Sequence, residues 1–180
     1  LDFNKSYKSP AAKDYKIRLK KIVNILNEIN ADIICLQEIE ITGSTNNISK
    51  PLKDLTDALN KKSGYKYDYY ILSLPNYSTD KPEINCAFIF KAQALKLQTR
   101  MQVMSDMNKQ YGSSNINRHI YGQFKFQNEI INIFNVHLPR PDGDLKDINK
   151  ICLLKANAVA AYYSKQRYNS ILIGDFNLYG

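Results

Sequence analysis

The sequence predicts an α+β fold with strands in the centre and helices outside. Helical and strand-like segments alternate in the first third of the chain, strands rich in β-branched and aromatic residues fill the middle, and a helix followed by an apolar run comes last. The chain has 180 residues, of which 44% are hydrophobic and 23% charged, as expected for a globular protein with a core of its own. Because no repeat or long linker interrupts it, we predict a single domain over residues 1–180.

The first third of the chain contains two predicted helices around one strand. Apolar residues recur at helical spacing from Tyr15 to Ile29, with lysines on the other face. Asp32 to Leu36 is a short apolar run, which is typical of a strand buried on both faces. A second helix is expected to begin near Pro51, a residue suited to the first helical turn, and to end at Gly64.

The middle of the chain predicts mostly antiparallel strands. Five segments carry the expected composition, namely Tyr65–Leu72, Ile84–Lys91, Ala94–Arg100, Ile120–Phe126 and Ile130–Leu138. The segment from Met101 to Asn117 is irregular and is expected to be a loop. A helix over Leu145–Lys165 and a buried strand over Ser170–Ile173 complete the predicted order.

Charge and cysteine content narrow the classes of protein. The net charge of +8 suggests an anionic partner, although a solvated basic surface explains it as well. The cysteines Cys35, Cys86 and Cys152 form no closely spaced pair, which favours buried thiols over a zinc site or disulfides. The longest apolar stretch, Ala158 to Tyr163, is far shorter than the roughly 18 residues of a membrane-spanning helix, so we predict no membrane span.

Three predicted strands end in polar residues that suit catalysis. Glu38 follows the first apolar run, His137 ends the run before the last helix, and Asp175 and Asn177 follow the last strand. Taken alone, Asp175 and Asn177 would be turn residues, Glu38 an exposed residue and His137 a structural residue. A carboxylate in a partly dry site is unfavourable unless a cation such as Mg²⁺ compensates it. Together they would supply a metal ligand, a proton donor and polar groups, as phosphate-ester hydrolysis requires.

Three motifs in this order resemble the endonuclease/exonuclease/phosphatase superfamily. They run from Ala31 to Glu38 and end in Leu36-Gln37-Glu38, from Asn135 to Leu138, and from Ile173 to Asn177 with Gly174-Asp175-Phe176-Asn177. The chain is most similar to the pancreatic deoxyribonuclease type and its bacterial relatives. The resemblance implies a four-layer α/β/β/α sandwich with two packed, mostly antiparallel sheets and an active site at one end of them. It also implies a metal-dependent phosphodiesterase, with DNA as the expected nucleic-acid partner of a monomer.

The resemblance assigns a role to each of the strand-end residues. Glu38 would hold Mg²⁺ or Mn²⁺, and Asp175 would position or help to deprotonate the attacking water. Asn177 would contact the scissile phosphate, while His137 would donate a hydrogen bond to that phosphate or assist the leaving oxygen. The metal would stabilise charge that develops on the phosphoryl oxygens.

Two further residues are expected to contact the substrate. Arg118 stands where deoxyribonuclease-like members carry a phosphate-gripping arginine, and its guanidinium fork suits bidentate contact with phosphate. The alternative is a surface arginine in no particular contact. Tyr77 stands where nuclease relatives place a groove-contacting aromatic residue.

The resemblance also predicts that the chain is incomplete at both ends. The family pattern begins with a strand that bears an Asn near the metal and ends with a Ser-Asp-His strand whose His is the general base, and neither is present. We therefore expect little or no hydrolysis by the 180-residue chain alone. The alternatives are a phospholipid or phosphoinositide phosphoesterase of the same fold, and a catalytically degenerate nucleic-acid-binding domain. The compartment would be secreted or periplasmic if an N-terminal signal was removed, and cytoplasmic otherwise.

Overall fold

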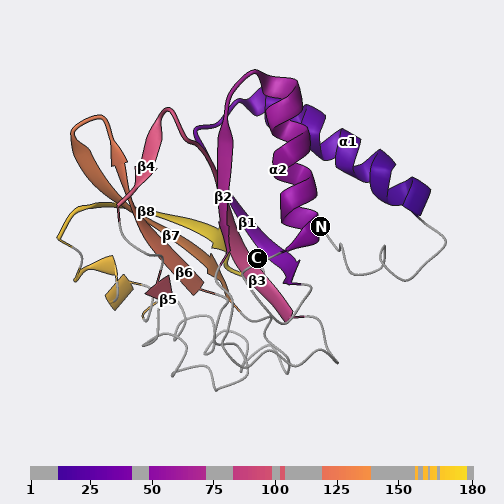
Figure 1. Ribbon diagram of the computed structural model, residues 1–180. Coiled ribbons are helices and arrows are strands. Elements are labelled where there is room, and N and C mark those ends of the chain that lie inside the picture. Colours follow the sequence, from indigo (N-terminus) through magenta and orange to yellow (C-terminus); the bar gives the residue numbers. More distant parts are fainter. Residues whose placement is uncertain are drawn as a thin grey trace, which may run out of the picture. The chain divides into compact units, whose positions relative to one another are not determined.

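The structure is a computed structural model that describes residues 12–41, 49–71, 83–98, 102–103, 119–138, 157, 160–161, 163–165 and 167–177. The chain divides into two compact units, Leu1–Lys96 and Leu97–Gly180, and each is described by itself. A three-stranded sheet lies in the first unit, and a five-stranded sheet begins at the boundary and continues through the second (Figure 1). That residues 1–180 form one domain remains a prediction.

The helices and strands follow the predicted order and confirm the α+β fold class. The elements are α1 (Ala12–Ile29), β1 (Ile33–Ile41), α2 (Lys50–Ser63), β2 (Tyr67–Ile71), β3 (Glu83–Lys91), β4 (Leu95–Leu97), β5 (Gln102–Val103), β6 (His119–Phe126), β7 (Glu129–His137) and β8 (Asn169–Asp175). The first strand is longer than predicted, the fourth is shorter, and β5 lies in the predicted loop. Within the predicted last helix, Asn157, Ala160, Ala161 and Tyr163 are helical.

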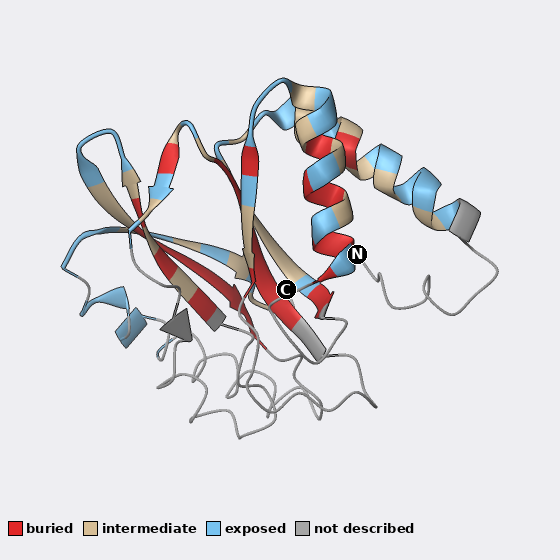
Figure 2. Cartoon of the chain, viewed as in Figure 1, coloured by how far each residue is buried: buried red, intermediate tan, exposed pale blue. Residues whose placement is uncertain are grey.

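The first unit packs its two helices over an antiparallel sheet with the strand order β1-β3-β2. Figure 2 shows the buried residues of α2 along the side of the helix that faces the strands. The fully buried core residues come from both helices and all three strands, and they include Val23, Leu52, Leu55, Leu59, Tyr67, Ala87 and Ile89. The apolar periodicity in the sequence therefore identified the buried helix faces, except at Ile29, which is exposed.

Local signals in the sequence set both ends of α2. The side chain of Ser49 accepts a hydrogen bond from the backbone nitrogen of Leu52 at 3.3 Å, and Pro51 lies in the first turn. Gly64 ends the helix in the left-handed conformation, with φ 73°. The hydroxyl of Ser49 also donates to the carbonyl oxygen of Glu40 at 2.6 Å, which ties the start of α2 to β1.

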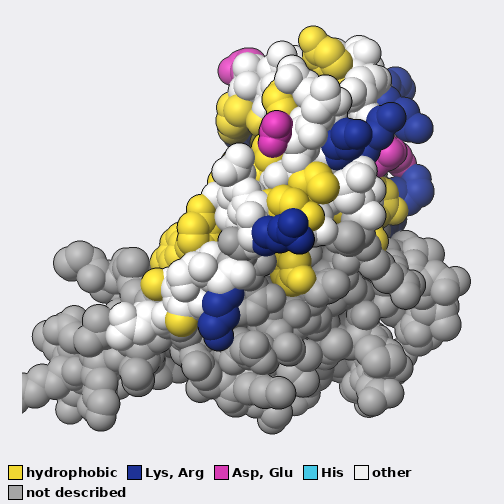
Figure 3. Space-filling model, turned by 90° about the vertical axis from the view of Figure 1, so that its left-hand side faces the viewer, with side chains coloured by type: hydrophobic (Ala, Val, Ile, Leu, Met, Phe, Trp, Pro, Cys, Tyr) yellow, Lys and Arg dark blue, Asp and Glu magenta, His cyan; other side chains and the backbone are white. Residues whose placement is uncertain are grey.

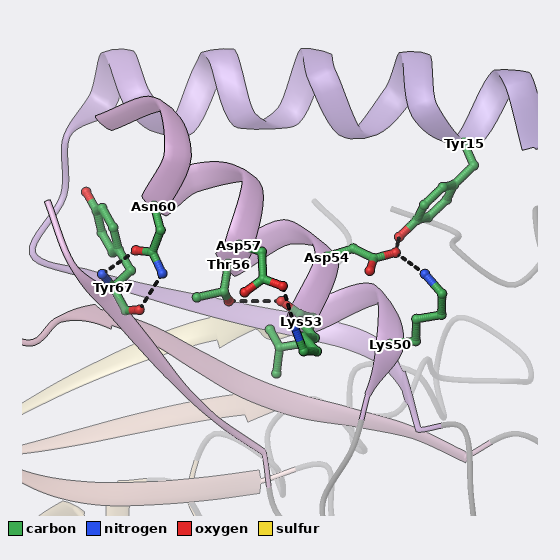
Figure 4. Close-up of polar contacts among 9 residues, drawn as sticks. Tyr15, Lys50, Lys53, Asp54, Thr56, Asp57, Asn60 and Tyr67 are labelled. Carbon is green, nitrogen blue, oxygen red and sulfur yellow. Dashed lines mark hydrogen bonds and ion pairs between the residues drawn. The ribbon is translucent and has the colours of Figure 1, made fainter. Parts of the chain in front are cut away.

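Side chains of α2 also hold β2 and α1 (Figure 4). The amide of Asn60 donates to the carbonyl oxygen of Tyr67 at 3.0 Å and accepts from its backbone nitrogen at 2.5 Å. This amide satisfies backbone groups at the edge of the sheet, much as another strand would. On the other side, Asp54 accepts from the hydroxyl of Tyr15 at 2.9 Å and forms an ion pair with Lys50.

The second unit contains the sheet in which β4, β6, β7 and β8 are neighbours in that order, with β5 also paired to β6. The pairs β5–β6 and β6–β7 are antiparallel, whereas β7–β8 is parallel. The prediction of mostly antiparallel strands is confirmed, and β8 is the exception. Phe134, Val136 and Leu138 form a buried cluster on one face of β7, and the ring of Tyr163 lies 6.0 Å from that of Phe134.

The described cysteines are free thiols, and the prediction of buried thiols is confirmed for Cys86, whereas Cys35 is half-buried. Cys86 is buried, and burial raises the pKa of the Cys35 thiol from its ordinary value of 9.0 to about 12. Cys152 lies outside the described residues. Because the thiolate is the reactive form and burial lowers its fraction, alkylation of Cys35 should be more than about tenfold slower in the native chain than in the unfolded one. Mass-mapped labelling with iodoacetamide at pH 8, with and without urea, measures this ratio, and equal rates would contradict it.

Candidate active site

The parallel pair β7–β8 places His137 beside Asp175. Each is the last residue of its strand, and the two are Cα partners across the pair. Partners in neighbouring strands project their side chains from the same face of a sheet, so the imidazole and the carboxylate share one face. The ladder continues one step further, because the backbone nitrogen of Leu138 donates to the carbonyl oxygen of Asp175 at 2.9 Å.

Asn177 is tied to both strand ends. Its backbone nitrogen donates to Oδ1 of Asp175 at 2.9 Å, and its side-chain Nδ2 donates to the carbonyl oxygen of Leu138 at 2.5 Å. Its φ of 46° lies in the left-handed region, which Asn adopts more readily than most residues. The turn that Asp175 and Asn177 were expected to form therefore exists, and it brings Asn177 to the end of β7.

Gly174 allows the two strands to approach at this point. A Cβ atom built on Gly174 would lie 1.9 Å from the carbonyl oxygen of Val136, its Cα partner on β7. No larger residue fits without moving the backbone, so glycine is required directly before Asp175. No separate role was predicted for Gly174, although glycine next to a strand-end carboxylate is a visible signal in the sequence.

Burial differs sharply across this group of residues. His137 is 6% exposed, whereas Asp175 is exposed and Asn177 is half-buried. Asn135, two residues before His137 on the same face of β7, is fully buried. The imidazole of His137 thus lies just below the surface, and the carboxylate of Asp175 lies at the surface. This arrangement suits proton transfer to a substrate that binds at the surface.

Glu38 lies inside β1 rather than at its end, which corrects the predicted strand boundary. Leu36 is paired with Ala87 and Ile39 with Asn85, so two residues of β1 oppose one residue of β3. This is a β-bulge, and Glu38 has a left-handed φ of 56° within it. The bulge depends on the pairing with β3, and it was not predicted from the sequence of β1.

The bulge keeps the core continuous and leaves Glu38 exposed. Ile34, Leu36 and Ile39 all pack in the same core, although strict alternation would place Ile39 on the opposite face. The extra residue absorbs this change of period, and Glu38 is exposed while Glu40 is buried. A non-glycine residue in the left-handed region costs about 1–2 kcal/mol, and such strain is often found at functional sites.

This strain predicts an unusual order of stability for variants of Glu38. The Glu38→Gly variant should be more stable than the Glu38→Ala variant, with a free energy of unfolding about 1 kcal/mol higher, because only glycine adopts this φ without strain. Urea unfolding of both variants of the chain measures the difference. Asp68, an exposed residue of β2, is the control. There the glycine variant should be less stable than the alanine variant by about 0.5–1 kcal/mol. The same order at both positions would contradict strain at Glu38.

The structure brings together three of the predicted site residues, namely His137, Asp175 and Asn177. Glu38 belongs to the first unit, so its distance from these three remains a prediction. Arg118 and Tyr77 lie outside the described residues. Within the described part of the chain, no group of three or more His, Cys, Asp or Glu side chains could hold a metal ion.

Basic side chains on the described surface are dispersed. On the face in Figure 3, the Lys and Arg side chains lie in separate groups with hydrophobic and uncharged side chains between them. No helix among the described residues is long and apolar enough to cross a membrane.

Solved structures with a similar fold cover nearly all of this chain. An endonuclease/exonuclease/phosphatase family protein from Leptotrichia buccalis superposes with a TM-score of 0.65 at 15% identity, covering 96% of this chain and 63% of that one. TDP2 from D. rerio in complex with a single-strand DNA product gives 0.58 at 14%, covering 93% and 56%. A mannosyl-6-phosphatase from Bacteroides thetaiotaomicron gives 0.58 at 20%, covering 91% and 58%.

These likenesses establish the fold and leave the branch open. No protein-family model matches the sequence, and no curated protein matches it. The chain spans 58%, 56% and 44% of the length of three TDP2 structures that it matches. The superfamily resemblance predicted from the three motifs is therefore confirmed at the level of the fold, while the deoxyribonuclease-like branch remains a prediction.

Proposed function

We propose that this chain, which has the fold of the endonuclease/exonuclease/phosphatase superfamily, forms part of a metal-dependent phosphodiesterase, and that its substrate is nucleic acid. The observation that carries the proposal is the pairing of His137 with Asp175 at the ends of β7 and β8, with Asn177 bonded to both strand ends. An imidazole, a carboxylate and an amide at one edge of a sheet are the groups that phosphate-ester hydrolysis uses.

Each of the three side chains has a distinct proposed role. His137 donates a hydrogen bond to a phosphoryl oxygen or protonates the leaving oxygen, and the exposed carboxylate of Asp175 orients the attacking water. The amide of Asn177 has two N–H donors, and the contact with Leu138 uses one of them. The other is proposed to contact the scissile phosphate, at a position that the same contact with Leu138 holds in place.

Glu38 is the proposed ligand of Mg²⁺ or Mn²⁺. Mg²⁺ commonly uses one or two protein carboxylates, with water and substrate phosphate as its other ligands. An exposed carboxylate on a bulge inside a strand fits that need, because the backbone is held by β3 while the side chain reaches solvent. A bound ion would stabilise the negative charge that develops on the phosphoryl oxygens.

Nucleic acid is the proposed substrate, for two reasons. The net charge of +8 favours a polyanion, and a structure with the same fold, TDP2 from D. rerio, was solved with a single-strand DNA product. A second candidate is a small phosphomonoester, which the likeness to a mannosyl-6-phosphatase supports. A lipid phosphoester and DNA binding without cleavage remain possible results of the test.

The test compares substrates in Mg²⁺ and in EDTA. Supercoiled plasmid, a phosphoinositide and a sugar phosphate are each incubated with the full natural protein and with the 180-residue chain. We expect plasmid cleavage by the full protein, its loss in EDTA, and little activity of the 180-residue chain. Hydrolysis of only a lipid or sugar phosphate would change the substrate class, and salt-sensitive DNA binding without cleavage would overturn the enzymatic proposal.

A further inference from the structure

The apolar pattern of β7 and β8 does not by itself select the observed register. On one face, Ile133 is paired with Ile171, while the neighbouring isoleucines Ile131 and Ile173 are paired with Asn169 and Asn135. A shift of β8 by two residues would keep every side chain on its face and would pair both isoleucines of β8 with isoleucines of β7. Apolar matching on this face therefore favours the shifted register.

The shifted register would take the site apart. Asp175 would then oppose Asn135, one pair away from its observed partner His137. In the observed register Ile171 and Ile173 are 45% and 39% exposed, so their burial contributes only part of what it could. Some other interaction has to hold β8 where it is.

A line of polar side chains on the opposite face supplies this interaction. Asn132 is 1% exposed, and Ser170 is its Cα partner. Gln123 of β6 donates to Oδ1 of Asn132 at 3.1 Å, and Nδ2 of Asn132 donates to the hydroxyl oxygen of Ser170 at 3.2 Å. That hydroxyl in turn donates to the carbonyl oxygen of Tyr168 at 2.8 Å. The bonds run across β6, β7 and β8.

A shift by two residues would break this line of bonds. Leu172 would oppose Asn132, and a buried amide would lose the acceptor that Ser170 provides. Phe176 would oppose Val136, at the place where only glycine fits in the observed register. The hydrogen bonds of Asn132 and the close contact at Val136 thus favour the observed register, whereas the pairing of isoleucines favours the shifted one.

We propose that Asn132 and Ser170 are positioning residues that hold β8 in the register in which Asp175 lies beside His137. This inference deepens the proposed function and rests on it for the importance of that pairing. The register itself is a structural property, so it is testable without any assay of hydrolysis.

Disulfide trapping reports the register directly. Ile131→Cys with Asn169→Cys joins Cα partners of the observed register, whereas Ile131→Cys with Ile171→Cys joins residues that become partners only after the shift. Neighbouring strands lie about 4.8 Å apart, within reach of a disulfide, and positions two residues out of register lie beyond about 7 Å. Both positions on β8 are exposed, and mass mapping of peptides identifies the linked pair.

The two cysteine pairs are compared with and without Asn132→Leu, which removes the amide at similar size. We expect the observed-register pair to link at least about tenfold faster in the parent, and this preference to fall about tenfold with Asn132→Leu, as the loss of a hydrogen bond of about 1.4 kcal/mol implies. Asn128→Leu, at an exposed position in the turn between β6 and β7, should leave the preference unchanged.

Three results would overturn the proposal. The first is an unchanged preference with Asn132→Leu. The second is loss of both disulfides in Asn132→Leu, because the hydrogen bonds of Asn132 would then hold β8 against β7 without setting its register. The third applies if Asn132→Leu fails to fold, in which case the milder Ser170→Ala decides, and an unchanged preference in that variant counts against the proposal.

Discussion

Replacing His137 by alanine is expected to lower kcat for phosphodiester hydrolysis by the full protein about 10²–10⁴-fold, the range for a lost proton donor or acceptor. The imidazole is 6% exposed at the end of β7 and lies in register with Asp175, so alanine removes a proton donor from beside the carboxylate that is proposed to orient water. Plasmid cleavage at saturating Mg²⁺ measures the loss. His119→Ala, the same substitution at the other histidine, is the control.

A companion variant separates the charge of Asp175 from its hold on the turn. Asp175→Asn keeps an oxygen that accepts from the backbone nitrogen of Asn177, whereas Asp175→Ala removes both charge and acceptor. If the carboxylate orients water, both variants should lose activity to a similar degree. Near-normal activity of Asp175→Asn would show that Asp175 serves only the turn, and normal activity of His137→Ala would remove the imidazole from the mechanism.

Replacing Gly174 by alanine is expected to lower the free energy of unfolding by more than about 3 kcal/mol, the upper range for a single substitution. The added Cβ would lie 1.9 Å from the carbonyl oxygen of Val136 and 2.7 Å from its carbonyl carbon, and neither atom belongs to a flexible side chain. The strands must therefore separate, which also weakens the bond between Leu138 and Asp175.

Gly64 is a matched control for this prediction. It has φ 73°, and nothing lies within 4 Å of an added Cβ, so Gly64→Ala carries only the conformational penalty of about 1–2 kcal/mol. Gly174 also has a positive φ, 156°, so the loss in Gly174→Ala beyond that in Gly64→Ala, measured by urea unfolding, reports mainly the steric contact. Equal losses would mean that β8 moves away from Val136 at little cost, and the close approach would then be unimportant for the site.

Short sequence patterns predicted the features that depend on interactions between residues close together in the chain. The second helix was expected to begin near Pro51 and to stop at Gly64, and the capping by Ser49 and the left-handed Gly64 account for both ends. The positions of His137 and Asp175 at strand ends were predicted because each follows an apolar run that stops there. These signals lie within a few residues of the feature that they predict.

The features that the sequence did not predict depend on a second strand. The bulge at Glu38 arises because Leu36 and Ile39 must both face the core while β3 sets the pairing. In the same way, β8 was predicted as a buried strand, which is wrong because Ile171 and Ile173 are exposed. Its parallel alignment with β7 follows from pairing across a long stretch of chain.

The sequence by itself determined the fold class, the order of the elements and the chemistry that three strands carry. The tertiary structure decided which of these residues meet, because the period of a strand sets the face of a side chain while only the partner strand sets its register. The meeting of Asp175 with His137 thus depends on Gly174 against Val136 and on the hydrogen bond between Asn132 and Ser170. Both are contacts between β7 and β8, which lie far apart in the sequence.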